Sequence, residues 1–230
     1  MINNCRELEK QLEINFNNIS LLENALIHRS YLNEHKKFHL PSNEKLEFLG
    51  DSVLSLTTTI YLYHHYPELD EGIYTDIKAS IVRTESLADA AKVINIGKYL
   101  YLSKGEELHG GRDNKNILAD CFEAVVGAIF IDRSFDSAYD FIVKYLFHKK
   151  LDYIVKNKLY LSPKSRLQEI VQSKYKVLPD YVITDEKGPE HQKQFVIAVY
   201  LKDKKLSEGR GNSKKEAEEE AAKIALKLVG

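Results

Sequence analysis

Hydrophobic residues recur at helical spacing through the first two thirds of the chain. Apolar positions three and four residues apart predict helices over residues 46–63, 75–94, 116–132 and 135–156. Strand-like alternation is rare in this part, and the glycine-containing stretch 103–114 is predicted to be a loop. The pattern therefore predicts an all-α first domain over residues 1–156.

The pattern changes near Ser162-Pro163, where a favoured N-cap residue precedes a favoured first helical residue. A helix is predicted from there to about Tyr175, followed by three short β-type segments at 180–185, 194–201 and 204–209. A closing helix is predicted over 213–229. The order α-β-β-β-α indicates a small α+β domain over 162–230, joined to the first by a linker at 157–161.

Composition and charge are ordinary for a globular protein, with 43% hydrophobic and 29% charged residues among 230. The longest apolar run, 124–131, is far too short to cross a bilayer, and residues 1–16 contain no signal-peptide core. Two cysteines provide no disulfide framework. We therefore expect a cytoplasmic protein without membrane contact.

The net charge of −1 is unevenly distributed. Residues 162–230 hold 14 Lys and Arg against 11 Asp and Glu, whereas residues 1–161 hold 19 against 23. The basic second part suits a polyanion and the acidic first part suits metal ligands, although both margins are small.

Two apolar helical stretches carry acids at helical spacing. Glu44, Glu47 and Asp51 lie at i, i+3 and i+7, and Asp120 and Glu123 repeat the i, i+3 spacing. Between residues 117 and 131 the last two are the only charged residues. An isolated carboxylate in such surroundings protonates, pairs with a cation or binds a metal. Five acids on two apolar helices indicate a site for a hard cation, since cations such as Mg²⁺ prefer oxygen ligands.

Two alternatives compete with a metal site. A lone Glu-x-x-Glu is usually a solvated helix face, but the apolar flanks leave little helix surface for water. The acids could instead form buried salt bridges with Arg83 or Arg112. One or two arginines cannot neutralise five acids, so metal binding is favoured.

The same residues resemble a known family. Residues 44–54 resemble the signature of ribonuclease III endonuclease domains, and residues 120–127 resemble their second acidic motif. Asp70-Glu71-Gly72 resembles the segment that supplies a further acid, and His28-Arg29-Ser30 matches an early family motif. The resemblance covers almost the whole chain in the expected order. It implies a metal-dependent endoribonuclease that cleaves double-stranded RNA.

The resemblance also implies roles for the acids. Glu47, Asp51, Asp120 and Glu123 form the metal-binding cluster, with Glu123 the main ligand, while Glu44 and Glu71 act as accessory catalytic acids beside Asp51 and Glu123. Two divalent ions about 4 Å apart activate the attacking water and stabilise the leaving oxygen. Mg²⁺ is expected, with Mn²⁺ able to substitute. His28 is expected to be a structural histidine.

The resemblance further implies a homodimer through the endonuclease domain, in which Phe48 packs into the partner. The expected products have 5′-phosphates, 3′-hydroxyls and short 3′ overhangs, and the expected role is processing of ribosomal and messenger RNA precursors. Core packing would explain Phe48 equally well.

The second domain resembles the double-stranded-RNA-binding domain. In its most specific motif, residues 209–217, Ser213 caps a helix and Lys214 and Lys215 lie at the amino-terminal end, where the helix dipole also attracts phosphate. Gln168 and Gln172 could reach one minor groove and His191 a second, with a plain surface histidine as the alternative for His191. Glu218 stands where many such domains have a third basic residue, so modest, salt-dependent affinity is expected.

Two rival functions remain at this point. An RNA-binding relative with an inactive endonuclease domain would have lost some of the six acids, and all six are present. A scaffold with salt-bridged acids would leave the basic second domain unexplained. The sequence favours the enzyme.

Overall fold

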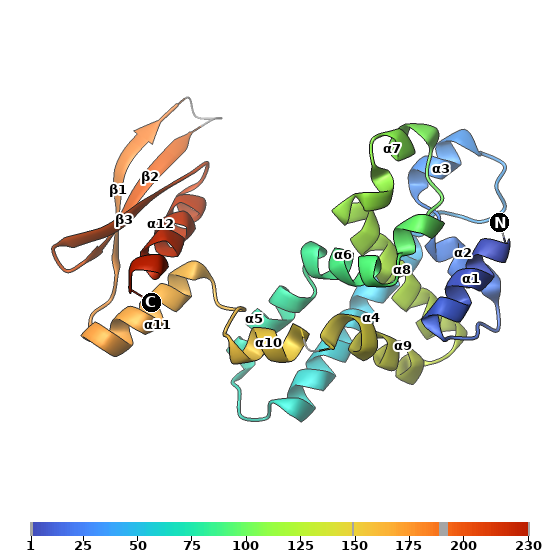
Figure 1. Ribbon diagram of the computed structural model, residues 1–230, viewed down its shortest axis with the longest axis horizontal. Helices are drawn as coiled ribbons and strands as arrows, with labels where there is room; N and C mark the ends of the chain where they lie inside the picture. Colours follow the sequence, from blue (N-terminus) through green and yellow to red (C-terminus); the bar gives the residue numbers. More distant parts are fainter. Residues whose placement is uncertain (1, 149, 189–192, 230) are drawn as a thin grey trace. The chain divides into compact units, whose positions relative to one another are not determined.

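The computed structural model describes residues 2–148, 150–188 and 193–229. It divides into two compact units, residues 1–156 and 157–230 (Figure 1). The first is helical, and the second has a three-stranded antiparallel sheet with two helices. The predicted fold, an all-α domain followed by a small α-β-β-β-α domain, is confirmed.

The first unit is an assembly of α-helices connected by short turns. Its helices in chain order are α1 (Ile2–Leu12), α2 (Ile19–Ala25), α3 (Arg29–Glu34), α4 (Glu44–His65), α5 (Glu71–Ile81), α6 (Thr84–Val93), α7 (Lys104–Leu108), α8 (Lys115–Asp132), α9 (Phe135–Ile142) and α10 (Lys150–Lys156). The 3-10 turns η1 (Ile96–Tyr99) and η2 (Gly111–Asp113) and the π-helical turn η3 (Val143–Phe147) complete it.

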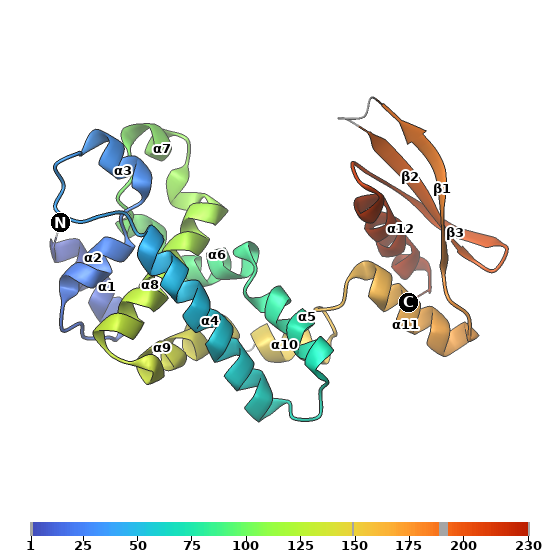
Figure 2. The ribbon, with the colours of Figure 1, turned by 180° about the vertical axis from the view of Figure 1, so that it is seen from behind.

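Helix α8 is the centre of this unit. It packs against α4, α6, α2 and α9, and α4 runs across it in both views (Figure 2). Between residues 117 and 129, every residue of α8 is buried except Asp120 and Glu123. The hydrophobic effect therefore fixes α8 in the core, with its two acids at the edge of that core.

The prediction of a single helix over residues 75–94 is wrong, because the chain forms two helices there, α5 and α6. Arg83 takes an extended conformation (φ −68°, ψ 154°) and breaks the helix. The break lets α5 pack against α4 and α10 while α6 packs against α8. Tertiary packing thus overrides a continuous helical pattern.

Residues 135–156 also depart from the single predicted helix, since α9 passes into η3 and then α10. The N–H of His148 donates to the carbonyl of Val143, five residues earlier, at 3.0 Å. This is the hydrogen-bond spacing of a π-helix rather than of an α-helix. The predicted loop 103–114 likewise contains the short helix α7 and the turn η2. Ser103 caps α7 by accepting from the N–H of Glu106 at 3.1 Å.

The second unit consists of α11 (Pro163–Tyr175), β1 (Asp180–Lys187), β2 (Gln194–Leu201), β3 (Lys204–Gly211) and α12 (Lys214–Val229). The strands pair in the order β1-β2-β3, and both helices cover one face of the sheet (Figure 1). The core under the helices comprises Leu167, Val171, Val199, Ala221, Ala222 and Ala225.

Strands β1 and β3 each extend two residues beyond their predicted ends. The backbone ladder continues through the pairs Lys187 with Gln194 and Phe195 with Gly211. Charged residues and glycine hide this extension from a hydrophobic pattern. Gly209 lets β3 lie close to α12, since a Cβ there would be 2.2 Å from the backbone nitrogen of Ala221.

Two expectations from composition can be compared with the described residues. No helix among them combines the length and apolar character needed to span a bilayer. Cys5 and Cys121 are both free and buried.

Candidate metal centre and nucleic-acid interface

Two crossed helices supply the acidic side chains of the first unit. Glu47 lies in the first turn of α4, and Asp120 and Glu123 lie on α8. The start of α4 is anchored by Asn43, whose side-chain amide donates to the carbonyl of Ala25 at 3.2 Å. The start of α8 is capped by Asn114, which accepts from the N–H of Asn116 at 2.9 Å. Both helix starts are thus fixed.

The two helices touch backbone to backbone at two glycines. A Cβ on Gly50 of α4 would lie 1.8 Å from the carbonyl oxygen of Glu123, and one on Gly127 of α8 would lie 2.3 Å from that of Leu46. Only glycine permits this approach. The crossing therefore places the backbone of Glu123 against Gly50 of α4. It also places the backbone of Leu46, the residue before Glu47, against Gly127 of α8.

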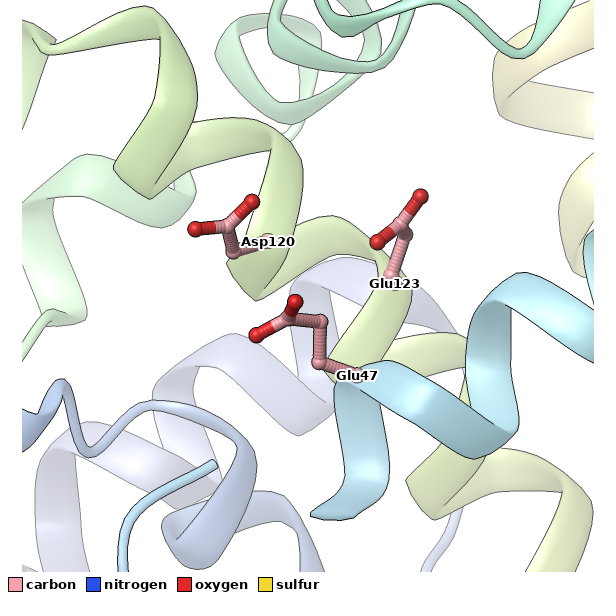
Figure 3. Close-up of side chains that lie close together, drawn as sticks. All are labelled: Glu47, Asp120 and Glu123. Atoms are coloured by element: carbon pink, nitrogen blue, oxygen red, sulfur yellow. The ribbon is translucent and has the colours of Figure 1, made fainter. Parts of the chain in front are cut away.

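The side chains of Glu47, Asp120 and Glu123 converge at this crossing (Figure 3). Each offers a carboxylate oxygen, and these oxygens lie within 4.8 Å of one another. All three residues are half-buried. We call this group the acidic triad.

The electrostatics of the acidic triad are unfavourable without a cation. Burial, and then the charges of Asp51, Glu47 and Asp120, raise the pKa of Glu123 from 4.5 to about 8. Burial also raises the pKa of Glu47 and of Asp120, and neighbouring acids add to the effect at Glu47. Oxygen donors that repel one another suit a divalent cation, so the residues present fit a hard metal ion.

The other predicted acids lie outside the triad. Asp51 is exposed on α4, and its charge acts on Glu47 and Glu123. Glu44 begins α4, where it accepts from the hydroxyl of Ser42 at 2.7 Å and pairs with Arg29 at 3.8 Å. Glu71 is exposed at the start of α5. The described structure thus groups three of the six acids within ligand distance.

Neither arginine considered from the sequence neutralises the acidic triad. Arg83 pairs with Glu85 at 4.0 Å. Arg112 pairs with Glu107 at 2.7 Å and donates to the carbonyls of Gly97, Lys98 and Leu100. Arg29 is an exposed arginine near the triad: its charge partly offsets the rise in the pKa of Glu47 and Asp120 that burial causes, and sequence analysis gave it no role.

His28 has the structural role expected of it. It caps α3, and its Nδ1 accepts from the N–H of Ser30 at 3.3 Å. Because Nδ1 is an acceptor, the proton of the neutral ring is on Nε2. Burial lowers the pKa of His28, which favours this neutral form.

In the second unit, the start of α12 forms the predicted basic end. The hydroxyl of Ser213 accepts from the N–H of Glu216 at 3.2 Å, and Glu216 in turn accepts from the N–H of Asn212 at 2.7 Å. Lys214 and Lys215 are exposed there, and Lys214 also lies over the ring of Phe195 at 5.9 Å. Neither lysine has an acidic ion-pair partner among the described residues, so both are available to phosphate.

The remaining predicted RNA contacts have a less complete structural basis. Gln168 and Gln172 are both exposed one turn apart on α11. His191 lies outside the described residues. Glu218 pairs with Lys164 at 2.6 Å, so its negative charge is partly compensated by the neighbouring helix.

Comparisons with known proteins assign both units. Residues 18–150 match the family model described as Ribonuclease-III-like, and residues 163–229 match the double-stranded RNA binding motif. Ribonuclease 3 of Chloroflexus aurantiacus is 45% identical over 98% of this chain and 92% of its own length. This chain belongs to the ribonuclease III family. Ribonuclease 3 of Dehalococcoides mccartyi is similarly related, at 46% identity over 96% of this chain and 92% of that protein.

A solved structure supports the same assignment for the first unit. The nuclease domain of ribonuclease III from Campylobacter jejuni is 34% identical, with a TM-score of 0.57, and the match covers 61% of this chain and 94% of that domain. The chain is therefore a ribonuclease III, an endoribonuclease of double-stranded RNA, with its nuclease and RNA-binding parts both present.

Proposed function

We propose that this ribonuclease III hydrolyses the phosphodiester bonds of RNA duplexes at the acidic triad, with Mg²⁺ held by Glu47, Asp120 and Glu123. The observation that carries the proposal is the convergence of three carboxylates within 4.8 Å, from two helices whose surrounding residues are buried. Mn²⁺ is expected to substitute, because it accepts the same oxygen ligands. Asp51 is the proposed ligand for a second ion.

The roles of the side chains follow from their charges. Bound divalent ions activate the attacking water and stabilise charge on the leaving 3′ oxygen. Glu123 is largely protonated near neutral pH without a cation, so it must release its carboxyl proton when it becomes a ligand. Glu44 and Glu71 are proposed as accessory residues, on the strength of their motifs.

Cleavage of a long RNA duplex with and without Mg²⁺ tests this function. We expect cutting only with the cation, at duplex and not at single-stranded RNA of the same sequence. The fragments should carry 5′-phosphates, 3′-hydroxyls and short 3′ overhangs. Cutting in excess chelator would contradict a metal-dependent site, and tight duplex binding without cutting would favour an RNA-binding protein with an inactive nuclease domain.

We propose that Lys214 and Lys215 bind phosphates of the duplex, with Ser213 fixing the start of their helix and Gln168, Gln172 and His191 reaching the minor grooves. Replacing either lysine by Ala should weaken duplex binding roughly tenfold at moderate salt, because each phosphate contact releases counterions. The slope of log affinity against log salt should fall by about 1 for each lysine. Fluorescence anisotropy over a salt series measures both.

Lys223→Ala is the matched control for these lysines. Lys223 lies on the same helix and pairs with Glu220 at 3.6 Å. Its replacement should leave both the affinity and the salt slope close to those of the parent. Equal losses in all three variants would show that the effect comes from overall charge.

We also propose a homodimer formed through α4. Phe48, Leu56 and Tyr63 lie on one side of this helix and are 79%, 52% and 68% exposed. An exposed apolar stripe beside the acidic triad suits a self-complementary interface with a second copy of the chain.

Phe48→Glu should convert the dimer to monomers at micromolar concentration, because it places a charge in the apolar interface. Sedimentation velocity measures the change. Leu108→Glu is the control, since Leu108 is 85% exposed on α7, away from the stripe. A dimer that survives Phe48→Glu, or one disrupted equally by Leu108→Glu, would rule out this interface.

The proposed cellular role is processing of ribosomal and messenger RNA precursors in the cytoplasm. The free buried cysteines agree with a reducing compartment. Cells without the protein should accumulate uncut double-stranded precursor regions, and unchanged precursor levels would contradict the role.

A further inference from the structure

The amino-terminal end of α3 brings a cation to the edge of the acidic triad. The guanidinium Nη1 of Arg29 lies 3.8 Å from Oε1 of Glu44, and the two side chains are 74% and 56% exposed. Oε2 of Glu44 accepts from the hydroxyl of Ser42 at 2.7 Å. Glu44 is therefore held in place from one side and orients Arg29 from the other.

The ion pair with Glu44 places Arg29 next to the acidic triad. Glu44 precedes Glu47 by three residues in the first turn of α4, so the two carboxylates lie on the same side of that helix. Arg29 reaches this position from α3, a different element from the two helices that carry the triad.

The backbone that carries Arg29 is firmly attached to the rest of the unit. The N–H of His28 donates to the carbonyl of Tyr101 at 3.2 Å, and the N–H of Ser103 donates to the hydroxyl of Ser30 at 3.1 Å. Nδ1 of His28 lies 2.8 Å from that same hydroxyl. Residues on both sides of Arg29 are thus tied to the segment 101–103, which gives the guanidinium a rigid base.

An exposed guanidinium on an anchored backbone, beside an acidic cluster, matches the chemistry of a phosphodiester. The centre repels an RNA strand unless cations offset its charge, and the planar fork of arginine binds phosphate oxygens. At 3.8 Å, the contact with Glu44 is an ion pair and is too long for a hydrogen bond. Glu44 therefore orients the guanidinium without occupying its N–H donors.

We infer that Arg29 binds a non-bridging phosphate oxygen of the RNA strand at the acidic triad and that Glu44 is its positioning residue. The inference rests on the proposed function of the triad. It gives Glu44 a role toward substrate through Arg29. It also gives a function to the second residue of the His28-Arg29-Ser30 motif.

The test compares Arg29→Gln, Arg29→Lys and Glu44→Gln with the parent in the full-length protein. Arg83→Gln is the matched control, since Arg83 is also exposed and paired with an acid, at 4.0 Å, but belongs to no part of the site. Three quantities are measured: the single-turnover cleavage rate at saturating enzyme, the salt slope of duplex binding without divalent cation, and the Mg²⁺ concentration that gives half of the rise in melting temperature.

Arg29→Gln should lower the cleavage rate on the order of 100-fold, as expected for loss of one donor to the reacting phosphate. Its salt slope should fall by about 1, and it should need no more Mg²⁺ than the parent. Arg29→Lys should recover part of the rate because it keeps the charge without the fork. Glu44→Gln should reduce the rate less than Arg29→Gln, with the Mg²⁺ requirement unchanged.

Three results would overturn the inference while the parent still cleaves in a Mg²⁺-dependent way. The first is an Arg29→Gln protein that matches Arg83→Gln in rate and salt slope. The second is full recovery of the rate of Arg29→Gln at high Mg²⁺, which would make Arg29 only a neutralising charge. The third is a raised Mg²⁺ requirement in Glu44→Gln, which would show that Glu44 helps to bind the cation instead of positioning Arg29. Failure of the parent to cleave would instead reject the proposed function.

Discussion

Glu123→Gln should abolish RNA cleavage while leaving duplex binding intact. Glu123 is the triad acid whose pKa is raised most clearly, and the amide that replaces it cannot supply an anionic ligand. We expect the cleavage rate to fall by roughly 10³-fold or more, since the substitution removes charge from the reacting centre. Binding should survive because Lys214 and Lys215 belong to the other unit. Gel analysis of cleavage and anisotropy of binding measure the two effects.

The same substitution should stabilise the metal-free protein. Because the folded-state pKa of Glu123, about 8, is above 4.5, its contribution to stability is fully present below about pH 4.5 and is lost as pH rises through about 8. Above that pH the carboxylate is charged among other acids. Glutamine removes this cost, which is roughly 1–3 kcal/mol after allowance for solvent screening. The melting temperature should therefore exceed that of the parent by about 2–12 °C at pH 8.5, and by less at pH 5.5.

Glu85→Gln is the control for both effects. Glu85 is an exposed acid in the first turn of α6, and it pairs only loosely with Arg83 at 4.0 Å. This variant should cleave like the parent and show no pH-dependent gain in stability. A Glu123→Gln protein that still cleaves would remove Glu123 from the site, and one that is less stable than the parent at pH 8.5 would contradict its electrostatic account.

Gly50→Ala should damage both stability and cleavage, although it changes no charge. The added methyl would lie 1.8 Å from the carbonyl oxygen of Glu123, so α4 and α8 must separate. Overpacking of this kind costs about 1–3 kcal/mol or more. Separation also moves Glu47 away from the acids on α8, and a displacement near 1 Å reduces catalysis by about 10²-fold. Thermal denaturation and single-turnover cleavage measure the two losses.

Gly72→Ala is the matched substitution, because it also replaces a helical glycine. A Cβ at Gly72 would meet no atom within 4 Å. We expect unchanged cleavage and a gain of up to about 1 kcal/mol from the higher helix propensity of alanine. If Gly50→Ala behaved in the same way, the close crossing of α4 and α8 would not be what positions the triad.

Local pattern predicted those parts of the fold in which burial alone decides the structure. Helix α8 is the clearest case, since between residues 117 and 129 only its two acids, Asp120 and Glu123, remain outside the core. The break at Arg83 and the π-helical turn before His148 were not predictable, because neighbouring helices impose them on a continuous apolar pattern. The short helix α7 was not predicted either, because the glycines of residues 103–114 indicated a loop and α7 has too few residues to show an apolar repeat.

The acidic residues of the candidate site could be predicted from the sequence, but the arginine and the glycines around them could not. Helical spacing, together with the family resemblance, selected six acids, of which the structure groups Glu47, Asp120 and Glu123 within ligand distance. No sequence pattern indicated that Arg29 lies near these acids, because its contact with Glu44 joins residues fifteen positions apart in the chain. The roles of Gly50 and Gly127 were equally hidden, because a helix crossing depends on two segments that lie far apart in the chain.

The most direct test of the metal centre is the effect of Mg²⁺ on the melting temperature of the metal-free parent and of Glu123→Gln. A ligand that binds only the folded state stabilises it in proportion to the logarithm of its concentration. We predict a saturable, Mg²⁺-dependent rise in the parent that is absent or strongly weakened in Glu123→Gln. Equal rises in both proteins, or none in either, would contradict the assignment of the cation to the acidic triad.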